Sequence, residues 1–154
     1  MSKRMIILAP VLALVVTLSA GSAARADRVY HSHHYPLSPV GGAPLRSGYV
    51  ENIHANGPNV YAHEVYALNG ADDDASYQVS LSIWTSNTSC AGTPDLQLST
   101  ATVSTNDAGN GLAQAVFTPE QAGGLRGLTV SAMWSLLGGA SPAYRTGCEV
   151  LALD

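Results

Sequence analysis

Three of the five histidines in this chain lie within four positions, at His31, His33 and His34. Imidazole nitrogens bind borderline metal ions such as Zn, Cu and Ni, so clustered histidines are candidate ligands. In an extended strand His31 and His33 would face one side and His34 the other, whereas a flexible segment could wrap all three around one ion. We therefore expect weak Cu, Zn or Ni binding at most, and no resident cofactor.

A second histidine pattern lies at residues 63–67, where HEVYA begins like the zinc-protease motif H-E-x-x-H. Position 67 is alanine, and the stretch reads as a strand on which His63 and Glu64 point to opposite sides. His54 and His63 could flank a hairpin in which His63 pairs near Val50, about 13 Å along the strand from His54. These residues predict neither a zinc protease nor a shared histidine site.

Other catalytic patterns are equally weak. The sequence has no G-x-S-x-G elbow, and Glu51, Glu64 and Glu120 are scattered acids of the kind that is usually solvated. Residues 72–74 and 106–110 offer oxygen ligands that suit calcium, but they lack EF-hand spacing, and turns use the same residue types. We expect no catalytic residues and a protein that is not an enzyme.

The first 26 residues have the pattern of a secretory signal peptide. Lys3 and Arg4 precede an apolar run of about 14 residues, shorter than the roughly 20 that span a membrane, and Ala24-Arg25-Ala26 follows. Cleavage after Ala26 would leave four arginines against eleven carboxylates, a net charge of about −7. We expect a secreted, periplasmic or cell-envelope protein with no nucleic-acid partner and no membrane insertion.

The two cysteines, Cys90 and Cys148, are predicted to form a disulfide, because an exported chain folds in an oxidising compartment. The bridge would close a loop of roughly 58 residues. By reducing the conformational entropy of the unfolded chain, it would stabilise the folded state by roughly 4 kcal/mol. The wide spacing does not match the Cys-x-x-Cys pattern of redox sites.

Alternating apolar and polar residues predict strands along most of the remaining chain. Tyr77 and Val79, for example, alternate with Gln78 and Ser80, which is typical of a strand with one buried face. The predicted strands are 49–53, 60–68, 77–83, 96–103, 112–117, 128–136 and 144–153, separated by turn residues at 56–58, 69–74, 106–111 and 138–142.

Two local irregularities are also predicted. In the 96–103 strand the apolar phase slips between Leu98 and Ala101, which indicates a β-bulge. Thr118 and Gln121 have the spacing of a capping box around Pro119, which favours a single helical turn at most.

We therefore expect an all-β chain in three parts. Residues 1–26 form the signal peptide, and residues 27–46 form a flexible arm that contains the histidine cluster and three prolines. Residues 47–154 form a single antiparallel immunoglobulin-like β-sandwich of about seven strands with one disulfide.

The strand number and spacing resemble the immunoglobulin-like β-sandwiches, and the alanine- and glycine-rich composition is similar to that of small exported β-sandwich proteins of high-GC bacteria. The resemblance is architectural. Trp84 precedes Cys90 and Trp134 lies well before Cys148, so the disulfide core of antibody domains is not carried over.

A fold alone does not determine a function. We expect a non-catalytic binding or structural module of the cell envelope or extracellular space. Its partner would be an unknown protein or envelope component, contacted through loops or an exposed strand edge. The tyrosines at 61, 66, 77 and 144 could supply contacts to it or could equally be core or sheet-surface residues. The alternatives are a metal-binding protein that uses the histidine cluster and an enzyme with an unrecognised site.

Overall fold

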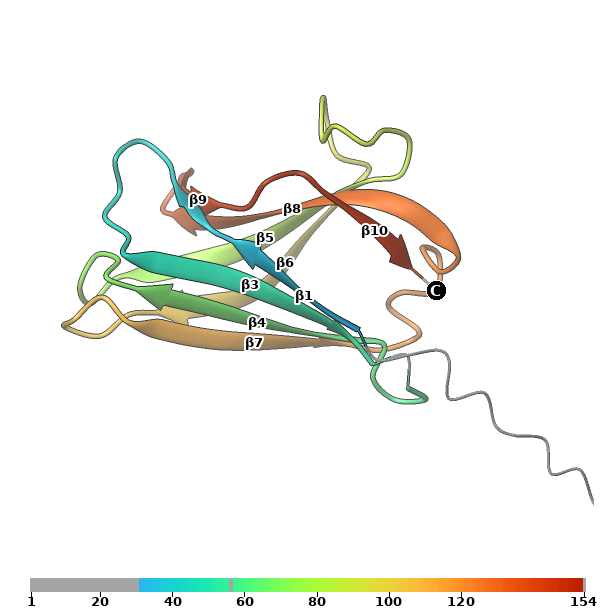
Figure 1. The fold of residues 1–154 in the computed structure, drawn as a ribbon, viewed down its shortest axis with the longest axis horizontal. Helices are drawn as coiled ribbons and strands as arrows, with labels where there is room; N and C mark the ends of the chain where they lie inside the picture. Colours follow the sequence, from blue (N-terminus) through green and yellow to red (C-terminus); the bar gives the residue numbers. More distant parts are fainter. Residues whose placement is uncertain (1–30, 56, 154) are drawn as a thin grey trace, which may run out of the picture.

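The computed structural model describes residues 31–55 and 57–153, which form two antiparallel sheets packed face to face (Figure 1). The first sheet has the order β1 (His31–Pro36), β3 (Ser47–His54), β4 (Ala62–Asn69), β7 (Gly111–Phe117). The second has the order β2 (Ser38–Pro39), β9 (Ser141–Arg145), β8 (Leu128–Gly138), β5 (Ser76–Trp84), β6 (Leu96–Ser104), with β10 (Glu149–Leu153) also paired to β8. The predicted all-β sandwich is confirmed.

All seven predicted strand regions are strands, and the region 144–153 is divided between β9 and β10. Both of these strands pair with β8, β9 along its second half and β10 along its first half. The predicted signal peptide at 1–26 lies outside the described residues. Within the described part of the chain, no helix is long and apolar enough to cross a membrane.

The segment predicted to be a flexible arm is part of the sandwich from residue 31 onward, so that prediction is wrong for residues 31–46. β1 pairs with β3 along its whole length, and β2 pairs with β9. Tyr35 and Leu37 are 8% and 6% exposed, because they face the core where the chain passes from one sheet to the other. Pro36 and Pro39 are tolerated because β1 and β2 are edge strands, where proline is found.

Aromatic side chains fill much of the space between the sheets. Trp134, Tyr66, Tyr77 and Tyr144 are almost completely buried, and Tyr61 is 4% exposed. Burying a large apolar side chain contributes about 1.5–3 kcal/mol, so these residues contribute strongly to folding. Of the two interpretations of these tyrosines, core residues or contacts to a partner, the first is therefore confirmed.

The bulge predicted in the 96–103 region is confirmed. Val79 pairs with Ala101 while the next residue, Ser80, pairs with Ser99, which leaves Thr100 as the extra residue of β6. The bulge changes which face of the strand the following residues occupy, and it directs the Thr100 side chain toward the interior.

The capping box at residues 118–121 also forms, although the turn does not extend into a helix. The Thr118 backbone N–H donates to Gln121 Oε1 at 2.8 Å, and the Gln121 backbone N–H donates to Thr118 Oγ1 at 3.3 Å. The chain then continues in turns to residue 127. This connection joins β7 in the first sheet to β8 in the second, at one end of the sandwich (Figure 1).

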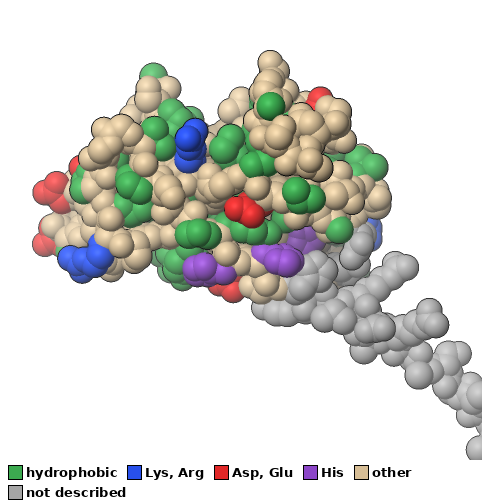
Figure 2. All heavy atoms as spheres, turned by 45° about the horizontal axis from the view of Figure 1, so that its top comes forward, with side chains coloured by type: hydrophobic (Ala, Val, Ile, Leu, Met, Phe, Trp, Pro, Cys, Tyr) green, Lys and Arg blue, Asp and Glu red, His purple; other side chains and the backbone are tan. Residues whose placement is uncertain are grey.

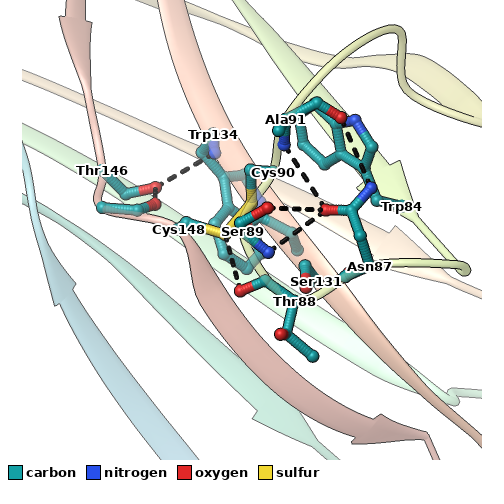
Figure 3. The surroundings of a disulfide bond; sticks show 12 residues. Trp84, Asn87, Thr88, Ser89, Cys90, Ala91, Ser131, Trp134, Thr146 and Cys148 are labelled. Carbon is teal, nitrogen blue, oxygen red and sulfur yellow. Dashed lines mark hydrogen bonds between the residues drawn. A yellow bond between two sulfur atoms is a disulfide. The ribbon is translucent and has the colours of Figure 1, made fainter.

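The predicted disulfide between Cys90 and Cys148 is present, with a Cα–Cα distance of 5.7 Å (Figure 3). It joins the loop between β5 and β6 to the short segment between β9 and β10. Asn87 shapes this loop, because its Oδ1 accepts the backbone N–H groups of Ser89 and Ala91. Its carbonyl accepts the Ser131 hydroxyl at 2.7 Å, which attaches the loop to β8.

Candidate functional site

β4 places a carboxyl group inside the sandwich. Its inner face carries Ala62, Glu64, Tyr66 and Leu68, and Glu64 is only 1% exposed. The interpretation of the glutamates as solvated charges is therefore wrong for Glu64. Buried carboxyl groups need hydrogen-bond partners, because an unpaired one costs several kcal/mol.

Glu64 receives hydrogen bonds from three strands. Asn52, its direct neighbour on β3, donates its Nδ2 group to Oε1 at 2.8 Å. Trp134, from β8 in the opposite sheet, donates Nε1–H to Oε2 at 2.9 Å, and the Tyr66 hydroxyl also contacts Oε2. The carboxyl group thus links the two sheets through buried polar contacts.

The Tyr66 hydroxyl extends this cluster to the bulge of β6, because its oxygen lies 2.7 Å from Thr100 Oγ1. A phenol has one proton and therefore donates to one of its two partners at a time. When Glu64 is ionised, Tyr66 donates to the carboxylate and accepts from Thr100. When Glu64 is protonated, the carboxyl group can donate to Tyr66, which then donates to Thr100.

Burial dominates the acid–base behaviour of this cluster. It raises the pKa of Glu64 above its ordinary value, against the opposing effect of the hydrogen bonds from Tyr66, Trp134 and Asn52 and of the charge of His63. Burial, followed by the negative charge of Glu64, also raises the pKa of Tyr66 well above its ordinary value. Tyr66 therefore stays protonated, and Glu64 is the group that titrates.

A cavity of about 370 Å³ lies between the sheets beside this cluster. Its polar groups come from eight lining residues: Asn52, His54, Tyr61, Glu64, Ser99, Thr100, Gln121 and Trp134. The rest of the lining is mainly apolar: Leu81, Ile83, Leu96, Leu98, Phe117, Ala122, Leu125, Val130, Ala132, Leu151 and Leu153. Residues of the 118–127 connection and of β10 contribute to it, so the cavity lies toward the end of the sandwich where that connection passes between the sheets.

Asn52 contributes an amide oxygen beside the cavity that has no hydrogen-bond donor among the described residues. Asn52 is 3% exposed, and its Nδ2 group is used by Glu64, whereas its Oδ1 atom accepts no hydrogen bond from any described residue. A buried amide oxygen without a donor costs about 1–3 kcal/mol. A bound molecule that donates a hydrogen bond to Asn52 Oδ1 would satisfy this oxygen.

The histidine cluster lies on β1, where the side chains of His33 and His34 do not converge. His33 and His34 are successive exposed residues of a strand, so they point to opposite faces. The His33 ring stacks on Tyr35 with 6.0 Å between ring centroids, and the His34 ring lies 4.2 Å from that of Tyr49. Figure 2 shows histidine side chains along one edge of the molecule. No group of three potential metal-binding side chains occurs among the described residues.

We expect the protein to bind Cu(II), Ni(II) or Zn(II) only at micromolar or weaker affinity, because collecting His31, His33 and His34 around one ion would break the pairing of β1 with β3. Calorimetric titration at neutral pH would measure this, with a variant in which all three histidines are alanine as the control. Submicromolar binding that is lost in the variant would contradict the prediction.

The other two histidines lie on opposite faces of the first sheet. The register pairs His54 with Ala62 and Ile53 with His63, so the predicted pairing of His63 near Val50 is wrong. The connection between β3 and β4 is longer than a two-residue turn, which moves the register. His54 is buried, whereas His63 lies on the outer face with its Nε2 3.2 Å from Gln114 Oε1. The prediction that His63 and Glu64 point to opposite sides is confirmed.

The two loops considered for calcium lie side by side and are held by turn hydrogen bonds. Ala71 N–H donates to Gly109 O at 3.0 Å, and Asn106 Oδ1 accepts two backbone N–H groups of its own loop. Asp72 accepts the Tyr77 hydroxyl at 3.0 Å. Asn106 therefore has a structural role in its own turn, and Asp72 in holding Tyr77.

Sequence reasoning missed the polar cluster around Glu64, because most of its members are far apart in the chain. They are Asn52, Tyr66, Thr100 and Trp134. The phase slip in the 96–103 region did point to Thr100, and the alternation of β4 placed Glu64 on the same face as Tyr66. No local signal connects Glu64 with Trp134, which is 70 residues away.

Comparison with protein-family models, with curated proteins and with solved structures found no match to this chain. The functional argument therefore rests on the cavity and on the buried groups beside it.

Proposed function

We propose that this protein is an exported, non-catalytic binding protein that holds a small, mainly apolar molecule between its two sheets. The observation that carries the proposal is the 370 Å³ cavity with apolar walls and a few buried polar groups. Small-molecule sites have this composition and commonly occupy about 300–1,000 Å³.

Export is part of the proposal. The signal-peptide pattern of residues 1–26 supports it, and the Cys90–Cys148 disulfide fits an extracellular or periplasmic protein. We assign the chain to the cell envelope, the periplasm or the secreted proteins, and its two packed antiparallel sheets to the immunoglobulin-like β-sandwiches.

An enzyme is the alternative that the cavity itself raises, because Glu64 and His54 both line it and these residue types perform acid–base catalysis. Binding is favoured because both oxygens of the Glu64 carboxyl group already accept hydrogen bonds from buried donors. A carboxyl group held in this way orders the core and is poorly placed to take a proton from a substrate.

A partner protein or envelope component is the second candidate. Leu112 and Val116 are 64% and 54% exposed on the outer face of β7, which provides an apolar strip for such a contact.

Binding of an uncharged apolar dye such as N-phenyl-1-naphthylamine tests the proposal. We expect saturable binding of one dye per chain, with increased dye fluorescence, to the protein with its disulfide intact. Leu98 lines the cavity and is only half-buried, so the fold can accommodate the larger indole ring of a tryptophan there. Because this ring would fill part of the cavity, Leu98→Trp should weaken dye binding at least tenfold.

Leu112→Trp makes the same change on an exposed outer position and should leave dye binding unchanged. Circular dichroism would verify that both variants are folded. Dye binding that is absent in the wild type, or equally affected by the two substitutions, would contradict a ligand cavity between the sheets.

A further inference from the structure

Three hydrogen-bond donors beside the cavity are already used by Glu64. Asn52 Nδ2, Trp134 Nε1 and the Tyr66 hydroxyl all lie against the Glu64 carboxyl group. Asn52 Oδ1 remains without a donor among the described residues. A molecule that enters the cavity therefore meets one amide oxygen that still lacks a donor, beside a carboxyl group whose two oxygens already accept hydrogen bonds.

From this arrangement we propose that the cavity selects apolar molecules that carry a hydrogen-bond donor, a hydroxyl or an amine, and rejects fatty-acid-like carboxylates. This inference rests on the proposed binding function and names the class of ligand. A hydroxyl or ammonium group can donate to Asn52 Oδ1, which supplies the missing hydrogen bond of a buried amide. An ether oxygen or an aldehyde offers only another acceptor.

Carboxylates are disfavoured for two reasons. Their oxygens need donors, and the three donors of the cluster already lie against Glu64. A carboxylate near an ionised Glu64 would also place two like charges in a region with little water, where their repulsion is poorly screened. An ammonium group would instead be attracted to Glu64.

The apolar walls determine the rest of the ligand. Leucine and isoleucine side chains from both strands of the β5–β6 pair line the cavity, together with Phe117 from the first sheet. An alkyl chain or a small ring would bury its surface here, with a gain of about 25 cal/mol per Å² removed from water. The polar group supplies selectivity, and the apolar part supplies most of the affinity.

The test uses four molecules matched in length: 1-octanol, octylamine, heptyl methyl ether and octanoate. Each is titrated against the protein with bound N-phenyl-1-naphthylamine, and displacement of the dye gives the affinity. We expect 1-octanol and octylamine to bind at least tenfold more tightly than the ether and octanoate, a difference of about 1.4 kcal/mol.

The variant Asn52→Leu removes the unpartnered oxygen and should bring the ether and 1-octanol to within about twofold of each other. Gln114→Leu replaces an amide on the outer face and should keep the wild-type preference. If Asn52→Leu does not fold, the Asn52 side-chain amide signals in the wild-type NMR spectrum provide the readout, and they should shift with 1-octanol and not with the ether.

The outcomes separate the two proposals. If neither the dye nor any of the four molecules binds, the binding function is wrong. Suppose instead that the dye binds while heptyl methyl ether and 1-octanol have equal affinities, or while octanoate has the highest affinity. In either case the cavity is a ligand site but its proposed selectivity is wrong. If 1-octanol and octylamine both bind more tightly than the ether and octanoate but with different affinities, the selectivity is supported. The tighter of the two then shows whether the preferred donor group of the ligand is a neutral hydroxyl or a cationic ammonium.

Discussion

Replacing Cys90 and Cys148 by serine should lower the free energy of unfolding by about 4 kcal/mol. The two cysteines are 58 residues apart, and the chain-entropy model predicts about this loss for a loop of that length. The structure adds a second reason, because the bridge attaches the β5–β6 loop to the junction at which the chain leaves β9 and begins β10. Urea unfolding followed by tryptophan fluorescence would measure the loss.

Reduction provides a matched control for this prediction. A reducing agent should bring the stability of the wild type close to that of the double-serine variant and should leave the variant unchanged. A loss below about 1 kcal/mol would show that the disulfide contributes little to the stability of this fold.

The second large effect is expected at Glu64. Glu64→Ala should lower the free energy of unfolding by about 3 kcal/mol, because three buried donors lose their acceptor at a cost of about 1–3 kcal/mol each. The removal of a carboxyl group that is costly to bury offsets part of this loss. Glu51→Gln, on the outer face of β3, should change stability by no more than about 0.5 kcal/mol.

Glu64 should also make stability depend on pH in an unusual direction. Burial raises its pKa in the folded protein above the ordinary value of 4.5. Between the ordinary and the raised pKa, the folded state binds more protons than the unfolded state, so the free energy of unfolding falls as the pH rises through this interval. Above the raised pKa, Glu64 is ionised in both the folded and the unfolded state, so its contribution to the free energy of unfolding no longer changes with pH.

Chemical denaturation at a series of pH values from 4 to 8 would test this, with Glu64→Gln as the control. The stability of the wild type relative to this variant should be greatest at the acidic end and should decrease toward neutral pH. A difference that grows with pH would mean that hydrogen bonding from Asn52, Tyr66 and Trp134 outweighs burial and lowers the pKa of Glu64.

Local patterns were sufficient for much of the fold. The alternation in 77–83 and 128–136 predicted β5 and β8, since a strand with a buried face repeats every two residues. The phase slip before Ala101 predicted the bulge at Thr100, and the spacing of Thr118 and Gln121 predicted their reciprocal hydrogen bonds. Each of these features depends on residues that are close together in the chain.

The histidine segment shows where this reasoning fails. Prolines and sparse apolar residues suggested a flexible arm, yet residues 31–36 pair with β3, and Tyr35 and Leu37 enter the core. Edge strands accept proline because one side of their backbone makes no sheet hydrogen bonds. Whether a segment becomes an edge strand depends on a neighbouring strand being available, and the segment itself contains no information about that.

The candidate site depended entirely on the tertiary structure. The sequence by itself determined that Glu64 and Tyr66 share one face of a strand, but Val65 and Ala67 make the other face apolar as well, so it did not determine which face is buried. Only the packing of β4 against β8 brought Trp134 to Glu64 and left Asn52 Oδ1, beside a cavity, without a donor from the described part of the chain. Alternation specifies which residues share a face, whereas the partners of a buried polar group are specified by strands that meet across the sandwich.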